Sequence, residues 1–221
     1  QDGDHTNVPR NFIIWDEGDR QAAVKQASRR LHIDEKAFPP RVLSSMISSA
    51  KNEMMTRAEF AAMSRRTGQK ASGKVYPVYE SLLREAGALD FDDLISRTVT
   101  LLSEHQQVRD KWRAQFKYVM IDEFQDTNAA QYKLIKLLTG AHQNIAVVGD
   151  DWQSIYSWRG ANYRNILNFE TDHPNCTVIK LEQNYRNTQN ILDAAHAVIT
   201  KNQSRSDKKL RTTAGIGKPV Q

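Results

Sequence analysis

Residues 118–127 read YVMIDEFQDT, a short apolar run that ends in carboxylates. Two similar apolar runs follow at residues 145–148 (IAVV) and 177–179 (TVI), and each also ends at a polar cluster. Buried strands of a parallel sheet have this pattern. A helix is predicted over residues 129–138, with Thr127 or Asn128 as its N-cap. Strands alternating with helices predict an α/β fold whose ligands collect at the carboxyl ends of the strands.

The part of the chain before Lys117 has a different period. Apolar residues recur at helical spacing, as at Val24, Ala27 and Leu31, so this half is predicted to be mostly α-helical. Two of its helices are expected over residues 76–86 and 91–102, with a break at Gly87 between them. The tail over residues 201–221 is polar and basic and is expected to be a loop or linker, or a piece whose fold lies further on.

Composition excludes several classes of protein. The 221 residues are 39% hydrophobic and 26% charged, which is a globular balance and predicts one large or two small domains. Mean hydropathy is −0.64, no apolar run approaches the roughly 18 residues of a membrane span, and no signal-peptide pattern is visible. The single cysteine, Cys176, excludes an internal disulfide, so a cytoplasmic protein is expected. A net charge of +5 is compatible with a polyanionic partner but is weak evidence for one.

The acidic pair Asp122-Glu123 after an apolar strand is a Walker B pattern. Mg²⁺ takes one or two carboxylates and bridges nucleotide phosphates, and a second carboxylate can orient the attacking water. The alternative for the same pair is a helix N-terminus, where acidic side chains also favour the macrodipole.

The residues around this pair extend the pattern. The second strand continues as VGDDWQSIYSWRGA (148–161), the third as LEQNYRNT (181–188), and LDFDDL (89–94) stands upstream. In order and spacing, residues 122–128, 148–161 and 181–188 resemble motifs II, III and IV of the UvrD/Rep/PcrA group of superfamily 1 DNA helicases. Residues 89–94 resemble the segment just before motif II in that group. The resemblance implies a partial RecA-like parallel sheet of the P-loop NTPase type with a mostly α-helical inserted subdomain. The resemblance implies three parts of the chain: residues 1–116 as the helical subdomain, 117–180 as part of the first RecA-like domain and 181–221 as the start of the second.

The resemblance also implies a nucleotide site. Asp122 would hold Mg²⁺ and Glu123 would position the hydrolytic water. Gln153 would sense the γ-phosphate, Arg186 would reach the same phosphate from the second domain, and Tyr185 would stack near the adenine. The alternatives are a turn amide for Gln153, a surface salt bridge for Arg186 and a half-buried core tyrosine for Tyr185.

A platform for single-stranded DNA is implied as well, formed by Phe91, Tyr156 and Trp158, with Arg159 beside a phosphate or base. Bases stack on aromatic faces without sequence preference. The alternative is that these rings belong to the core. Trp152 departs from the group, which usually has an acidic residue before the motif III glutamine, and no role is assigned to it.

One motif of the group is missing. The nearest match to a P-loop, Gly68 to Val75, has no hydroxyl for Mg²⁺ and follows no apolar strand, so it is predicted to be a basic loop. The resemblance therefore implies part of an ATP-dependent 3′–5′ helicase that uses ATP and Mg²⁺, acts on single-stranded DNA and duplex junctions in repair or replication, and is inactive as this chain alone. The alternative is a catalytically silent module that binds single-stranded DNA or another partner. A metal-dependent nuclease is a more remote one.

Overall fold

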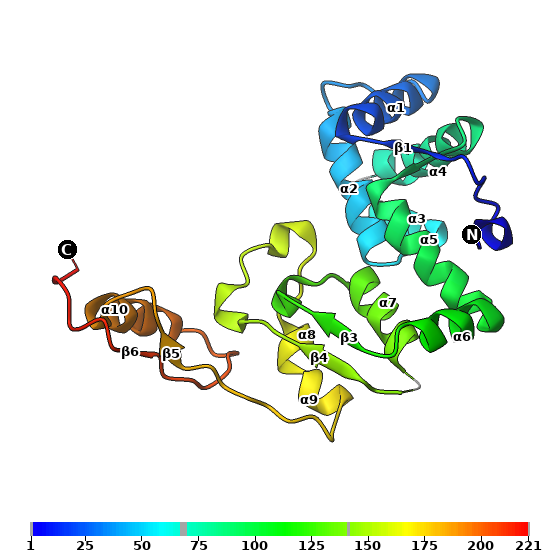
Figure 1. Cartoon of the computed structure of the whole chain (residues 1–221). Coiled ribbons are helices and arrows are strands. Elements are labelled where there is room, and N and C mark those ends of the chain that lie inside the picture. The colour runs from blue at the N-terminus through cyan, green and yellow to red at the C-terminus, as the bar shows by residue number, and fades with distance from the viewer. Residues whose placement is uncertain (1, 67–69, 141, 221) are drawn as a thin grey trace.

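The computed structural model describes residues 2–66, 70–140 and 142–220. The N-terminal half is mostly helical, as predicted, and lies at one end of the molecule (Figure 1). After a short 3₁₀ helix, η1 (Gly3–Thr6), its helices are α1 (Glu17–Arg30), α2 (Pro40–Asn52), α3 (Arg57–Arg66), α4 (Lys70–Glu85), α5 (Phe91–Glu104) and α6 (Gln106–Gln115).

The core of this half lies between α1, α2 and α4. Each of these helices buries one apolar stripe there, with Val24 from α1, Ile47 from α2, and Val75 and Tyr79 from α4. Asp16 begins α1 with a capping box, because its carboxylate accepts the N–H of Asp19 while the Asp19 carboxylate accepts the N–H of Asp16. The helical face predicted from Val24, Ala27 and Leu31 is confirmed as far as Ala27, and Leu31 packs against the same core.

The helical half also contains a two-stranded sheet that the sequence analysis did not predict. β1 (Ile13–Trp15) and β2 (Ala88–Asp90) pair in parallel, with Ile13 opposite Ala88. The prediction that this half is mostly helical holds, but it did not include these two strands. Each strand is only three residues long, too short for a periodic pattern, and each is defined by its partner across the chain.

Two expectations around α4 are also corrected. The helix expected over 76–86 begins at Lys70 and continues through Pro77, so Lys70–Val75 are helical and not the predicted basic loop. Val75 is fully buried, which supports helix packing at this position. Gly68 and Gln69, the rest of the P-loop near match, lie outside the described residues. The break at Gly87 is confirmed, since its φ of +58° ends α4.

The predicted strand–helix–strand unit is confirmed. β3 (Val119–Ile121) pairs in parallel with β4 (Ile145–Val147), and α7 (Ala129–Thr139) connects them. Asn128 is the N-cap of α7, because its side chain accepts the N–H of Gln131. The strand predicted at residues 177–179 is wrong: Val178 and Ile179 are exposed, and no strand pairs with this segment in the described part of the chain. An extended apolar segment becomes a strand only where a neighbour takes up its backbone hydrogen bonds.

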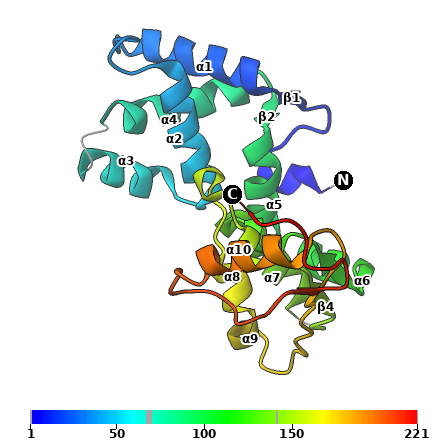
Figure 2. The same cartoon turned by 90° about the vertical axis from the view of Figure 1, so that its left-hand side faces the viewer.

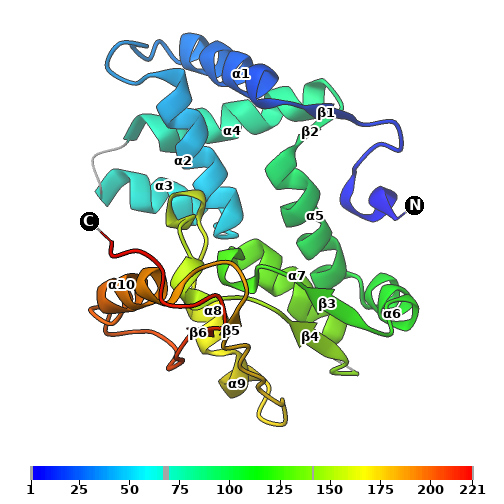
Figure 3. The same ribbon diagram turned by 60° about the vertical axis from the view of Figure 1, so that its left-hand side comes forward.

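The remaining elements follow β4. They are the 3₁₀ helices η3 (Asp151–Gln153) and η4 (Ser157–Arg159), the short helices α8 (Arg164–Leu167) and α9 (Phe169–Asp172), then β5 (Gln183–Asn184), α10 (Gln189–Ile199) and β6 (Arg211–Thr212). β5 and β6 pair in parallel, so the tail is more than a linker. Figures 2 and 3 show α1–α4 above and α7–α10 below, joined through α5. None of the described helices is long and apolar enough to cross a membrane.

Candidate functional site

The parallel pairing of β3 and β4 places residues 122–127 beside residues 149–153. The backbone continues the pairing beyond the strands, since the N–H of Phe124 donates to the carbonyl of Val148 at 3.0 Å. Phe124 is fully buried beneath this junction. The two motifs thus leave the sheet at the same edge, as the α/β pattern predicts.

Gln125 holds the two motifs together. Its side chain is buried, its amide nitrogen donates to Glu123 Oε2 at 2.7 Å, and its amide oxygen accepts the N–H of Asp150 at 2.8 Å. Gly149 leaves room for this bridge, because a Cβ at that position would lie 2.5 Å from the Gln125 amide oxygen. Sequence reasoning missed Gln125; the available signal was an amide set among carboxylates directly after an apolar strand.

Asp122 and Glu123 stand at the end of β3. Glu123 has a left-handed backbone with φ +50°, and its N–H donates to the Asp122 carboxylate at 2.9 Å. Glu123 occupies the N-cap position of the following 3₁₀ helix η2 (Phe124–Asp126), as the helix-terminus alternative expects, but its side chain makes no capping hydrogen bond there.

The carboxylates at this edge have the chemistry of ligands for a hard cation, but among the described residues they do not form a group of three or more that could hold a metal ion. Asp126 Oδ1 is buried without a hydrogen-bond partner, and Asp122 and Glu123 add further carboxylate oxygens within the same few residues. Burial, reinforced by the charge of Glu123, raises the pKa of Asp126. Carboxylate oxygens are the ligands that Mg²⁺ prefers.

Asp150 organises the turn after β4. Its carboxylate accepts the N–H of Trp152 at 2.9 Å and the Gln153 amide at 2.8 Å, and it binds Lys208 from the tail. Burial raises the pKa of Asp150, but the hydrogen bonds from Lys208 and Gln153 outweigh it and leave that pKa below its usual value. The turn-amide alternative for Gln153 agrees with this bond.

An open pocket of ≈ 620 Å³ brings three of the predicted residues together: Gln153, Tyr185 and Arg186 all line it. Tyr185 is 88% exposed, which rules out the core-tyrosine alternative. Asn184 shapes the turn below them by accepting the N–H of Arg186 at 3.0 Å. Within the described residues Arg186 forms no ion pair, so its salt-bridge alternative is not observed.

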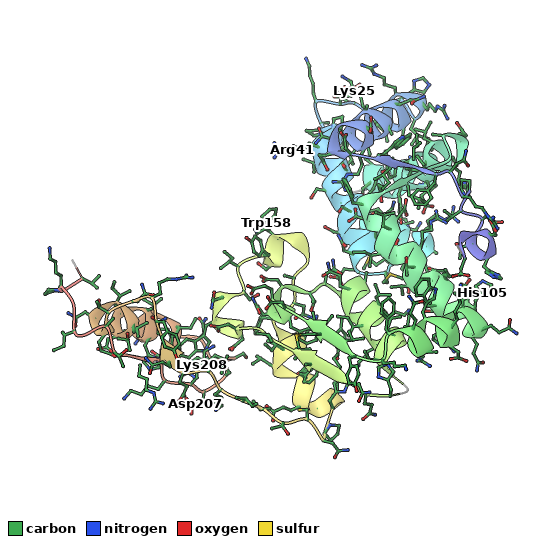
Figure 4. The ribbon with its side chains drawn as sticks, viewed as in Figure 1. Lys25, Arg41, His105, Trp158, Asp207 and Lys208 are labelled. Atoms are coloured by element: carbon green, nitrogen blue, oxygen red, sulfur yellow. The ribbon has the colours of Figure 1, made fainter. Side chains whose placement is uncertain are left out.

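The predicted DNA platform is exposed. Trp158 is 70% and Phe91 58% exposed, and the rings of Tyr156 and Trp158 lie 6.3 Å apart, so the core alternative is wrong for Trp158 and Phe91. Figure 4 shows Trp158 on the segment after β4, at its end nearest the helical half. Arg159 belongs to η4, but its side chain lies outside the described part of the structure.

A chain of amides joins the two parts of this platform. Asn128 donates to Asn52 at 2.9 Å, and Asn52 donates to Asp92, the neighbour of Phe91, at 3.2 Å. Gly160, two residues after Trp158, lies over the same amides, since a Cβ on it would be 3.8 Å from that of Asn128. Asn52 was not predicted, because nothing in the sequence around it marks a site.

Residues 1–174 match the family model of the UvrD/REP helicase N-terminal domain. The chain belongs to the UvrD/REP helicase family. Over 220 residues it is 44% identical to the ATP-dependent DNA helicase PcrA of Leuconostoc citreum and 42% identical to that of Staphylococcus aureus strain Mu50. These alignments cover 100% of this chain and 29% and 30% of the relatives. PcrA of Bacillus subtilis is 44% identical over 212 residues, which are 96% of this chain and 29% of that protein.

The chain thus spans about three tenths of the length of these UvrD/REP helicases. Family membership agrees with the resemblance seen in residues 89–94, 122–128, 148–161 and 181–188. It assigns no role to any single residue, so the parts that Asp122, Glu123, Gln153, Tyr185 and Arg186 play rest on their geometry.

Proposed function

We propose that this chain is part of an ATP-dependent, 3′–5′ DNA helicase, and that this part couples nucleotide hydrolysis to the binding of single-stranded DNA. The observation that carries the proposal is the bridge made by Gln125, which ties the Glu123 carboxylate to the loop bearing Gln153 and Trp158. The names of the relatives support ATP and DNA as its ligands. Duplex unwinding in repair or replication, action at duplex junctions and a cytoplasmic location belong to the same proposal.

The division of the chain is also proposed. Residues 1–116 would form the helical subdomain, 117–180 part of the first RecA-like domain, and 181–221 the start of the second. The parallel β3–β4 pair and the separate β5–β6 pair support this division. The cleft between the last two parts would take the nucleotide, since Gln153 from one and Arg186 from the other line the same pocket.

Each residue then has a distinct task. Asp122 would hold Mg²⁺, and Glu123, fixed by the Gln125 amide, would orient a water molecule. Arg186 presents a permanently charged planar fork suited to phosphoryl oxygens, and Tyr185 offers an exposed ring to a base. When bound, Mg²⁺–ATP supplies phosphoryl-transfer chemistry whose developing charge these groups would stabilise.

The proposal predicts that the 221-residue chain binds DNA but does not turn over ATP, because no complete P-loop motif occurs in its sequence. Binding is measured by the fluorescence anisotropy of a labelled oligo-dT and should weaken steeply between about 50 and 200 mM salt. Trp158→Ala should cost about 1–3 kcal/mol, or roughly 5- to 150-fold in Kd.

Tyr118→Ala is the matched control, since Tyr118 is an 83% exposed aromatic outside the proposed platform, and it should leave Kd unchanged. Equal losses in both variants would refute the platform. If this chain hydrolyses ATP and Glu123→Gln abolishes that hydrolysis, the prediction that a P-loop is needed is refuted. A silent DNA-binding module would show the same binding, and no ATPase even in a longer protein that contains a P-loop.

A further inference from the structure

Two residues of the polar tail, Ser206 and Lys208, contact the turn that follows β4. Ser206 donates its N–H to Asp151 Oδ2 at 2.7 Å and its hydroxyl to the other oxygen of that carboxylate. The carbonyl of Ser206 accepts the indole N–H of Trp152 at 3.2 Å. Segment 206–208 is therefore held by specific polar contacts, although it is more than fifty positions from the turn in the sequence.

Lys208 completes this contact. Its ammonium donates to Asp150 Oδ1, lies 3.8 Å from Asp151 Oδ1, and stands 4.6 Å from the centre of the Trp152 ring. The Lys208 side chain is only 14% exposed, so water screens these interactions weakly. The indole contributes a cation–π contact, and His196 of α10 lies against the same ring at 5.6 Å. Figure 4 shows Lys208 on the C-terminal part of the chain, away from the helical half.

The carboxylate of Asp150 is shared. Oδ1 is taken by Lys208, and Oδ2 accepts the amide of Gln153 at 2.8 Å. A carboxylate held by an ammonium on one oxygen presents the other in a fixed direction, so the amide that it binds is fixed as well. Gln153 in turn lines the pocket that contains Tyr185 and Arg186.

We propose that Lys208 is a positioning residue, which holds the Gln153 amide at the edge of this pocket through Asp150, with Trp152 as its second contact. The orientation of Gln153 thereby depends on where segment 206–208 lies. The role of Trp152 is then to hold the Lys208 ammonium against its ring. The inference rests on the proposed function only in taking the pocket as the nucleotide site; the orientation itself is measurable without a nucleotide.

The test uses the ¹⁵N-labelled 221-residue chain. The side-chain NH₂ resonances of Gln153 are identified by their disappearance in Gln153→Ala. Lys208→Met should loosen the hydrogen bond from Gln153 to Asp150, shift these resonances toward the position of glutamine side chains that bond only to water, and speed up their exchange with water. Lys208→Arg should restore them, because it returns the charge. Lys209→Met is the matched control, since Lys209 is the exposed neighbour, and should leave them in place.

If Lys208→Met moves the Gln153 resonances no more than Lys209→Met does, the proposal is overturned. Should Lys208→Met disturb the whole spectrum, Lys208→Gln, which keeps a donor but loses the charge, should still shift the Gln153 resonances in the same direction; no shift there also overturns it.

The two proposals fail separately. Displaced Gln153 resonances in a chain that binds no DNA would support the positioning role of Lys208 and count against the proposed function. Trp158-dependent DNA binding with stationary Gln153 resonances would do the reverse.

Discussion

Lys51→Met tests the buried ion cluster that anchors the segment carrying Phe91. The Lys51 ammonium lies 2.6 Å from Asp90 Oδ2 and 3.0 Å from Asp93 Oδ1, and these three side chains are at most 4% exposed. The Tyr79 hydroxyl donates to the same Asp90 oxygen at 2.7 Å. Methionine fills a similar volume but leaves the buried Asp90 carboxylate without a counter-charge and Asp93 with only Arg97, 3.7 Å away. The free energy of unfolding should therefore fall by about 3–5 kcal/mol at pH 7.

The pH dependence follows from the pKa of Asp90. Burial raises this pKa, but the charge and hydrogen bond of Lys51 outweigh burial and leave it below its usual value. The wild-type contribution is therefore present above the ordinary aspartate pKa of about 4 and is lost as the pH falls through the lowered one. Without Lys51, burial raises the Asp90 pKa, and protonation relieves the buried charge. The difference between variant and wild type should be largest at neutral pH and shrink as the pH falls.

Urea unfolding followed by far-ultraviolet circular dichroism measures both quantities. Lys111→Met is the control, because Lys111 pairs with Asp2 at 2.9 Å but is about half exposed, and an exposed pair contributes about 0–1 kcal/mol. The reasoning fails if the two variants lose the same stability, or if the loss in Lys51→Met grows toward acid pH.

Three further changes probe the contacts around the site. Gly149→Ala would place a Cβ 2.5 Å from the Gln125 amide oxygen and should cost about 1–3 kcal/mol by overpacking; an unchanged thermal midpoint would contradict the close approach. Asn128→Ala should cost about 1 kcal/mol by removing the N-cap of α7, seen as faster hydrogen exchange in the first turn of that helix but not in α10. Asn52→Ala removes the bridge between Asp92 and Asn128 and should weaken oligo-dT binding with Trp158 still in place; full affinity would show that the two halves of the platform act independently.

The parts of the fold that could be predicted are those with local patterns. β3 and β4 are predicted by apolar runs that end at polar residues, and α7 is predicted by its asparagine N-cap. β1 and β2 have no such pattern, because three residues show no period and four helices separate Ile13 from its partner Ala88 in the sequence. The segment at residues 177–179 has the right local pattern and fails as a strand for lack of a partner.

The same distinction separates the site residues. Carboxylates after strands are visible in the sequence, so Asp122 and Glu123 could be proposed from it. Gln125 and Lys208 act through Asp150, which is 25 and 58 positions away from them, and no spacing rule connects such residues. Trp152 could not be interpreted from the sequence for the same reason, since its indole N–H donates to the carbonyl of Ser206, 54 positions away.

Segment 149–160 touches every part of the molecule that the proposed function needs. Near its start Asp150 binds Gln125 and Lys208, and at its end Gly160 lies over Asn52 and Asn128. Between them, η3 and η4 leave only three residues outside helical turns, and the Ser154 hydroxyl is tied to the Gln125 carbonyl at 3.5 Å. Because this segment is short and held by these bonds, we expect a shift at Asp150 to move Trp158 as well. Changes at the proposed nucleotide pocket should therefore reach the proposed DNA platform through this segment, without passing through the core of the helical half.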